Sequence, residues 1–178
     1  MKKAAYPLPK VYGLLEPGPV VLLTTATQER ANVMTLSWHM IVEFEPPLVA
    51  YVVSNRDDSF EMLKASRECV INIPTTELAE KVVGCGNTHG SAVDKFKRFG
   101  LTPTTASMVK APLIEECYAN LECRVADRNM VEKYGLFILE VLKAWIDPSA
   151  TNPQTLHHRG KGVFMTAGET IKLASKMK

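Results

Sequence analysis

The sequence predicts a mainly β fold with inserted helices, arranged as an antiparallel Greek-key barrel. Apolar runs of strand length recur in both halves of the chain, as at 20–25 and 68–73. Segments with helical spacing gather between the early and the late strands, so they do not form regular β-α-β alternation. Residues 118–126 alternate apolar and polar side chains, which is typical of a half-buried antiparallel strand. Together these features favour a barrel with helices at its ends.

The first half should supply three strands of this barrel. Residues 27–30 form a polar turn, and Pro46 and Pro47 break the chain between the second and third strands. Because 48–53 is apolar at successive positions, that strand should be buried on both faces. Residues 40–45 have no clear form. The predicted strands are 20–25, 32–38 and 48–54.

Three short helices and one strand should follow. Asp58 or Ser59 can cap the first helix, and Thr76 can cap the second, which the glycines of 84–86 close. Gly100 ends the third helix. The predicted helices are 59–66, 77–83 and 91–99, with a strand at 68–73 that stops before Pro74.

The second half should return to strands. In 118–126 the side chains of Asn120, Glu122 and Arg124 should face water. The segment 134–146 is long and rich in β-favouring residues, so it should form a long, curved strand. The remaining predicted features are a last strand at 162–166, a basic tail at 167–178 and an extended, proline-rich N-terminal arm at 1–19.

Bulk composition limits the classes of protein to consider. The 178 residues suit a single domain spanning 1–178, and the 46% hydrophobic content supplies a core. A net charge of +2 gives no electrostatic case for nucleic acid or an anionic membrane. No apolar run of about 18 residues predicts a transmembrane helix. The charged N-terminus has no apolar segment behind it, so a cytoplasmic location is expected.

The four cysteines match neither a CxxC pair nor a compact disulfide framework. Reduced thiols in a cytoplasm are therefore expected. A zinc site built from Cys85, His89, Cys117 and Cys123 remains a minor alternative, since structural zinc sites usually use close pairs of ligands.

Two stretches carry candidate chemistry. In 54–59 a strand ends, a polar loop follows and a helix begins; a helix N-terminus, with Arg56 and Ser59 beside it, suits a phosphate. The alternative is a plain helix cap with a solvated arginine. The second stretch, 32–38, contains small polar residues and a tryptophan close together in sequence. It could be an irregular strand or the wall of a binding site. A hydrolase triad of Ser37, His39 and Asp57 or Asp58 lacks the GxSxG elbow.

Several motifs, in order, resemble one family. They are NVMTLSW, PPLVAYVV, RDDSFEMLKASRECVINIP, LAEKVVGCG, DKFKRFGLT and APLIEECYANLECRV. Their order and spacing from about Gly18 to Val125 resemble the flavin reductase-like, FMN-binding split-barrel family, and most closely its flavoredoxin type. The likeness continues more weakly through the last strands. It implies that the barrel is a split barrel with FMN as its cofactor.

The resemblance also implies a site. The strand at 32–38 would line the isoalloxazine edge and ribityl chain, the loop at 54–59 would hold the phosphate, and Phe96 would pack beneath the flavin. At His89 the family pattern has a small hydroxyl residue, so this chain departs from it there. No side chain is expected to act as an acid or base. The implied FMN-binding residues are Asn32, Val33, Met34, Thr35, Ser37, Trp38, Ser54, Arg56, Ser59 and Lys95.

The function implied by the resemblance is an FMN-binding oxidoreductase, an NAD(P)H-dependent flavin reductase that passes electrons to an acceptor protein or an oxygenase. The sequence does not choose between NADH and NADPH. One alternative is a flavoredoxin-like electron carrier with no nicotinamide activity, and another is a scaffold that has lost its flavin. Family likeness implies a homodimer with each flavin near the interface, to which the arm at 6–19 and the residues after His157 could contribute.

Overall fold

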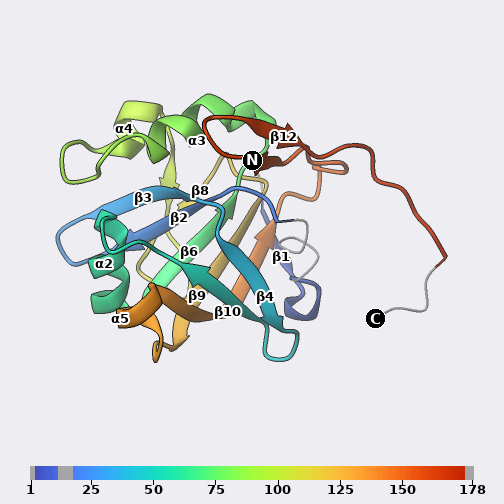
Figure 1. Ribbon diagram of the computed structural model, residues 1–178. Coiled ribbons are helices and arrows are strands. Elements are labelled where there is room, and N and C mark those ends of the chain that lie inside the picture. Colours follow the sequence, from blue (N-terminus) through green and yellow to red (C-terminus); the bar gives the residue numbers. More distant parts are fainter. Residues whose placement is uncertain (1–2, 12–17, 175–178) are drawn as a thin grey trace.

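The protein folds around one curled antiparallel sheet, seen in the computed structural model, which describes residues 3–11 and 18–174 (Figure 1). The strand order is β3-β2-β6-β9-β10-β5-β4, and β1 pairs with β10 off this path. The neighbours β2 and β6, and β5 and β10, are distant in sequence, as in a Greek key. The main-sheet strands are β1 (Ala4–Tyr6), β2 (Val21–Ala26), β3 (Ala31–Leu36), β4 (His39–Glu43), β5 (Leu48–Val52), β6 (Glu68–Ile73), β9 (Ala119–Asp127) and β10 (Leu136–Ile146).

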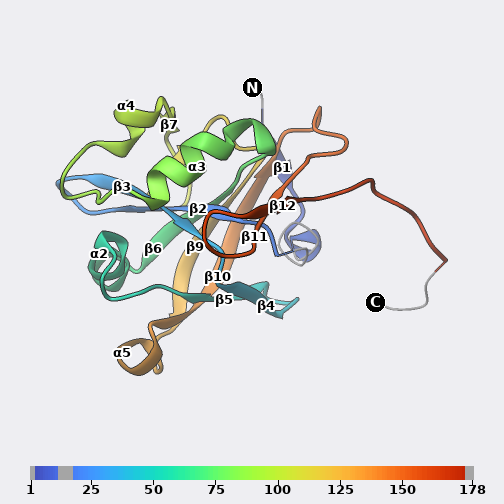
Figure 2. The ribbon, with the colours of Figure 1, turned by 45° about the horizontal axis from the view of Figure 1, so that its top comes forward.

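Short helices and two small hairpins complete the fold. In Figures 1 and 2, α3 and α4 lie across one end of the barrel, with the β11–β12 hairpin beside α3. The helices are α2 (Asp58–Ser66), α3 (Ala79–Gly86), α4 (Lys95–Phe99) and α5 (Val131–Tyr134), with 3-10 turns at Leu8–Lys10 and Thr76–Leu78. The small hairpins pair β7 (Pro103–Thr104) with β8 (Leu113–Ile114), and β11 (Leu156–His158) with β12 (Phe164–Thr166).

The predicted fold class is confirmed, and so are most of its strands. The barrel interior is filled by alternate side chains of the sheet together with Phe60 and Leu63 of α2. A second apolar cluster, which includes Val33, Val82 and Phe96, lies between the sheet and the helices α3 and α4. The strand β5 is buried on both faces at its centre, as its unbroken apolar run predicts.

Several helix boundaries differ from the prediction. The helix expected at 91–99 begins only at Lys95, because Asp94 has extended backbone and caps it by accepting from Lys97 N. The glycines expected to close the second helix lie inside α3, which ends at Gly86. Asp57, not Asp58 or Ser59, is the N-cap residue of α2, and its side chain makes no capping hydrogen bond.

The prediction that β9 is half-buried is wrong at Asn120 and Glu122, both 0% exposed. The segment 103–114 covers this face and supplies partners for both side chains. Asn120 Nδ2 donates to Ile114 O at 3.0 Å, and Glu122 accepts from Ser107 N and from Trp145 Nε1. Burial opposes ionisation of Glu122, but these hydrogen bonds outweigh it and lower its pKa.

The N-terminal arm is partly built into the sheet. Residues Ala4–Tyr6 form β1, which pairs with β10 of the same chain, and Tyr6 and Leu8 pack against the core. That stretch is therefore extended, and it pairs with a strand of its own subunit. Residues 12–17 of the arm and 175–178 of the basic tail lie outside the described residues. The described tail runs away from the body in Figure 1, and residues 168–174 are exposed.

Candidate functional site

The strand β3 lies at one end of the sheet order, so within residues 3–11 and 18–174 one of its edges has no neighbouring strand. Val33 O accepts a hydrogen bond from Lys95 Nζ at 2.9 Å, so the backbone of Val33 faces this free edge. Alternate residues of an antiparallel strand face the same way, so the backbone of Thr35 does so too. The edge therefore presents amide N–H groups to a ligand.

Three hollows meet along this edge, and Thr35 lines all of them. The β3–β5 groove, of 690 Å³, runs between β3, the turn after β5, α2 and α5. The Lys95 pocket, of 110 Å³, lies between β3, the start of α2 and the loop after α3. The hairpin pocket, of 500 Å³, lies between β3, α3 and the β11–β12 hairpin. Such connected space suits an elongated ligand.

Lys95 is a buried cation at the end of this edge. Its side chain is 5% exposed, and Nζ donates to Val33 O at 2.9 Å and to Cys85 O at 3.0 Å. Among the described residues, no carboxylate lies within 4 Å of Nζ. An ammonium has three N–H donors, so one remains for a ligand in the Lys95 pocket. Burial lowers the pKa of Lys95, while Cys85, Asp58 and Asp57 partly offset that effect.

Two carboxylates share the Lys95 pocket. Asp58 accepts from Ser91 N at 3.2 Å and lies 4.0 Å from the Arg30 guanidinium. Burial opposes its ionisation, but the Ser91 and Gly90 hydrogen bonds and Arg30 outweigh it and lower the pKa of Asp58. The charge of Asp58 is thus largely offset within the chain, which leaves Asp57 as the acid that competes with an anionic ligand.

The sequence-predicted residues divide among these hollows. Met34, Thr35, Ser37, Trp38 and Ser54 line the β3–β5 groove, and Trp38 is 72% exposed. Asn32 and Lys95 line the Lys95 pocket, together with Met34 and Thr35. The backbone of Val33 faces the free edge, while its side chain is buried in the cluster beneath α3.

The two residues favoured for a phosphate, Arg56 and Ser59, are placed differently. Arg56 is exposed and lines none of the three hollows. Ser59 is fully buried, and its hydroxyl accepts from Asn32 Nδ2 at 3.0 Å and from Thr25 Oγ1 at 3.3 Å. Ser59 therefore positions Asn32 from beneath.

The end of α3 and the loop that follows it approach β3 closely, and each has a glycine at the point of contact. A Cβ at Gly86 would lie 3.3 Å from Thr35 Cβ, and a Cβ at Gly90 would lie 2.0 Å from Asn32 Oδ1. Arg30 Nη1 holds this loop by donating to Gly90 O at 2.9 Å. His89, where the chain departs from the family pattern, is exposed at the mouth of the Lys95 pocket.

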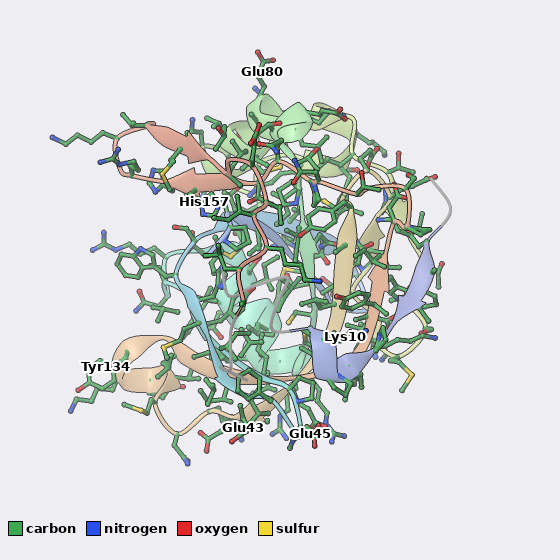
Figure 3. All side chains as sticks on the ribbon, turned by 90° about the vertical axis from the view of Figure 1, so that its right-hand side faces the viewer. Lys10, Glu43, Glu45, Glu80, Tyr134 and His157 are labelled. Atoms are coloured by element: carbon green, nitrogen blue, oxygen red, sulfur yellow. The ribbon has the colours of Figure 1, made fainter. Side chains whose placement is uncertain are left out.

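Some lining residues were not predicted. Lys64 of α2 and Glu132, Lys133 and Tyr134 of α5 line the β3–β5 groove, and Lys64 Nζ lies 2.8 Å from Glu132 Oε1. The short helix α5 gives no periodic signal, so the sequence offered nothing to place it here. In Figure 3, Tyr134 of α5 and His157 of the hairpin lie on the same side of the molecule, with His157 above Tyr134.

The alternatives to a cofactor site find no support. His39 Nε2 lies 2.7 Å from Pro19 O, and its ring stacks on Tyr51, so it is not free to activate Ser37. In the described part of the chain, no three His, Cys, Asp or Glu side chains are grouped so that they could hold a metal. The four cysteines are buried and form no disulfide.

Three features define an open-barrel protein for an elongated ligand: the free strand edge, the groove beside an exposed indole, and a buried ammonium with no carboxylate partner in the part of the chain that the structure describes. Such a ligand has an anionic end and a planar head with hydrogen-bonding edges. These features fit FMN, whose phosphate, ribityl chain and ring have that order.

Comparisons with known proteins agree. Residues 14–164 match the model of the flavin reductase like domain, so the chain belongs to the flavin reductase-like family and the predicted resemblance is confirmed. The chain is 33% identical over 172 residues to the Escherichia coli K12 protein YddH, covering 89% of this chain and 91% of that one.

Solved structures show the same fold. An FMN-binding domain of a flavin reductases-like enzyme from Shewanella baltica OS155 is 28% identical, with a TM-score of 0.91 over 97% of this chain and 98% of that chain. A flavoredoxin of Desulfovibrio vulgaris (Miyazaki F) is 22% identical, with a TM-score of 0.80 over 89% and 91%, and shows a shared fold. Within the described residues, no helix has the length and apolarity to cross a membrane.

Proposed function

We propose that the protein binds FMN and acts as an NAD(P)H-dependent flavin reductase, which passes electrons through the flavin to an acceptor protein or an oxygenase. Family membership supports this, as does the likeness to the Shewanella FMN-binding domain. The observation that carries the proposal is Lys95, a buried ammonium without a carboxylate partner among the described residues, beside the free edge of β3. A buried charge needs a counter-ion, and the FMN phosphate supplies one.

Different residues of the site would bind different parts of the cofactor. Lys95 would bind the phosphate, with Arg56 adding positive charge from the exposed loop. Asn32 and the outward amides of Val33 and Thr35 would bind the ribityl chain and the ring edge. Trp38 would cover the ring in the β3–β5 groove, where Ser37 and Ser54 supply hydroxyl groups.

Bound FMN supplies a ring nitrogen that accepts hydride from a nicotinamide and passes the electrons onward. The task of the chain is to position the ring and to stabilise its charge. Amide N–H groups on the β3 edge stabilise negative charge that develops at the ring, because they are fixed in direction before the reaction. No side-chain acid or base is required for hydride transfer.

The visible absorption spectrum of the purified protein tests this proposal, recorded under argon before and after addition of NADH and of NADPH. We expect a flavin spectrum that bleaches with one or both donors faster than free FMN does under the same conditions. A flavin spectrum that persists would favour a flavoredoxin-like carrier without nicotinamide activity. A colourless protein that cannot be reconstituted with FMN would reject both the reductase and the carrier, and would favour a scaffold that has lost its flavin.

We also propose that the protein is a homodimer. Four large apolar side chains in and beside β4 are exposed: Trp38, Met40, Val42 and Phe44. The strand β4 ends the sheet, so its outer edge pairs with no other described strand. Exposed apolar side chains on an edge strand favour association. We further propose a cytoplasmic location, on the ground of cysteine spacing.

A further inference from the structure

The loop that follows α3 places a histidine at the mouth of the Lys95 pocket. His89 lines this pocket, and its side chain is 75% exposed. The ring atom Nδ1 lies 3.9 Å from Asp58 Oδ2, which is within ion-pair distance when the ring is protonated. Because the ring is exposed at the pocket mouth, it is accessible to a ligand as well as to Asp58.

The backbone beside His89 is fixed to two other elements. Ser91 N donates to Asp58 Oδ2 at 3.2 Å, which ties the loop to the start of α2. Arg30 Nη1 donates to Gly90 O at 2.9 Å, which ties it to the turn before β3. The histidine is therefore held at the pocket mouth although its side chain is exposed.

The other charges of the Lys95 pocket do not suit a phosphate without a further cation. Lys95 supplies one positive charge, whereas Asp57 and Asp58 supply two negative charges. Arg30 offsets Asp58 from 4.0 Å away, so these four groups together are neutral. A phosphate monoester brings a charge of about −1.5 to −2 at pH 7. Among the described residues that line the pocket, His89 is the one whose side chain gains positive charge near neutral pH.

The two ring nitrogens of His89 have different surroundings. A protonated histidine has two N–H donors. The donor on Nδ1 is the one near Asp58, so the donor on Nε2 is left for a ligand. A carboxylate beside one ring nitrogen favours the charged form of the ring. The lowered pKa of Asp58 keeps this carboxylate ionised at neutral pH.

We infer that protonated His89 binds the phosphate of FMN and makes the affinity for FMN depend on pH. This rests on the proposed function. An anion favours the protonated ring, so the contribution of His89 is present at low pH and is lost as the pH rises through the range in which histidines titrate, about 5 to 8. Burial raises the pKa of the Cys85 thiol to about 11, so this thiol stays neutral there. The other ionisable groups around the pocket are Arg30, Asp57, Asp58 and Lys95.

Quenching of FMN fluorescence on titration with the apoprotein tests the inference, at a pH of about 5.5 and of about 8.5. His89→Gln should raise the dissociation constant by about 3- to 10-fold at the lower pH, because the lost contact is charge-assisted but exposed. At the higher pH the variant and wild type should agree within about twofold. The phosphate itself changes charge at a pH of about 6, and the ratio of the two constants removes that effect because the ligand is the same.

A lysine at this position separates charge from shape. His89→Lys carries its charge at both pH values, so it should bind FMN more tightly than wild type at the higher pH. A His89→Lys protein that binds FMN no better than His89→Gln at either pH would show that charge at this position does not reach the phosphate, and would overturn the inference.

Riboflavin, which lacks the phosphate, is the matched ligand, and its binding also shows that each variant is folded. His89→Gln should leave the constant for riboflavin unchanged at both pH values. The matched protein control is His157→Gln, because His157 lies on the β11–β12 hairpin and lines none of the three hollows. It should leave the constant for FMN unchanged.

The outcomes separate the inference from the proposed function. A wild type that binds FMN, with a His89→Gln protein that binds it equally well at the lower pH, would overturn the inference alone. Equal losses for FMN and riboflavin would also overturn it, because the phosphate would not be involved. A wild type that binds neither flavin would refute the proposed function and the inference with it.

Discussion

Replacement of Lys95 by methionine should weaken FMN binding. Methionine keeps most of the length of the side chain and removes its charge. Two of the three ammonium N–H groups already donate to Val33 O and Cys85 O, so one bond to the phosphate is lost. A hydrogen bond to a charged group contributes about 1.5–3 kcal/mol. The dissociation constant for FMN should therefore rise by about 10- to 150-fold, since about 1.4 kcal/mol corresponds to tenfold.

Quenching of FMN fluorescence on titration with the apoprotein measures this constant. Lys97→Met is the matched control, because Lys97 lies on the same helix with its side chain 88% exposed. It should leave the constant within about twofold of wild type, as expected for an exposed charge. Thermal melting of the apoproteins separates ligand binding from folding. A Lys95→Met protein that melts as wild type does and binds FMN with equal affinity would refute the placement of the phosphate.

Three further outcomes follow from the structure. Glu122→Gln should destabilise the fold by about 2–4 kcal/mol in urea unfolding, because an amide cannot accept from all the donors that surround this carboxylate; an unchanged midpoint would contradict this. Burial lowers the pKa of His39 in the folded state, so the neutral ring favours folding. The free energy of unfolding should therefore keep its full value above a pH of about 6.5 and decrease as the pH falls below it. The variant His39→Gln should show a smaller decrease. Val42→Lys should yield a monomer in sedimentation, whereas Met130→Lys, at a similarly exposed apolar residue, should not.

The strands could be predicted because their signal is local. An unbroken apolar run such as that in β5 needs burial on both faces wherever it lies in the fold. The polar face of β9 could not be predicted in the same way. Asn120 and Glu122 alternate with apolar residues as a solvated face does, and what buries them is a segment with no periodic pattern of its own. The strand β1 was not predicted for the same reason, since its partner β10 is far away in sequence.

The candidate site was predictable in its strand and less so in its loop. Asn32 and Thr35 are small polar residues in an apolar strand, and such residues at a sheet edge indicate a ligand. The helix-terminus argument for Ser59 assumed that its hydroxyl faces solvent. Thr25 and Asn32, which are distant in sequence, both donate to this hydroxyl instead. Lys95 was placed by family resemblance, and it matters as a site residue because it is buried with no carboxylate partner among the residues described.

Gly90→Ala should damage both stability and FMN binding. The new Cβ would lie 2.0 Å from Asn32 Oδ1, and Asn32 is buried with its amide donating to Ser59 Oγ. Either that hydrogen bond breaks or the loop moves away from β3, which also disturbs the bond from Arg30 to Gly90 O. Overpacking of this kind costs about 1–3 kcal/mol. We expect a lower melting temperature and weaker retention of FMN.

The matched control is Gly168→Ala, because a Cβ there meets nothing within 4 Å. A double-mutant cycle isolates the cause: if the clash with Asn32 is responsible, Gly90→Ala should cost less stability when Asn32 is already alanine. Equal costs in the two backgrounds would show that Gly90 matters for another reason. A Gly90→Ala protein as stable as wild type, with full FMN retention, would show that the loop does not need its close approach to β3 to complete the Lys95 pocket.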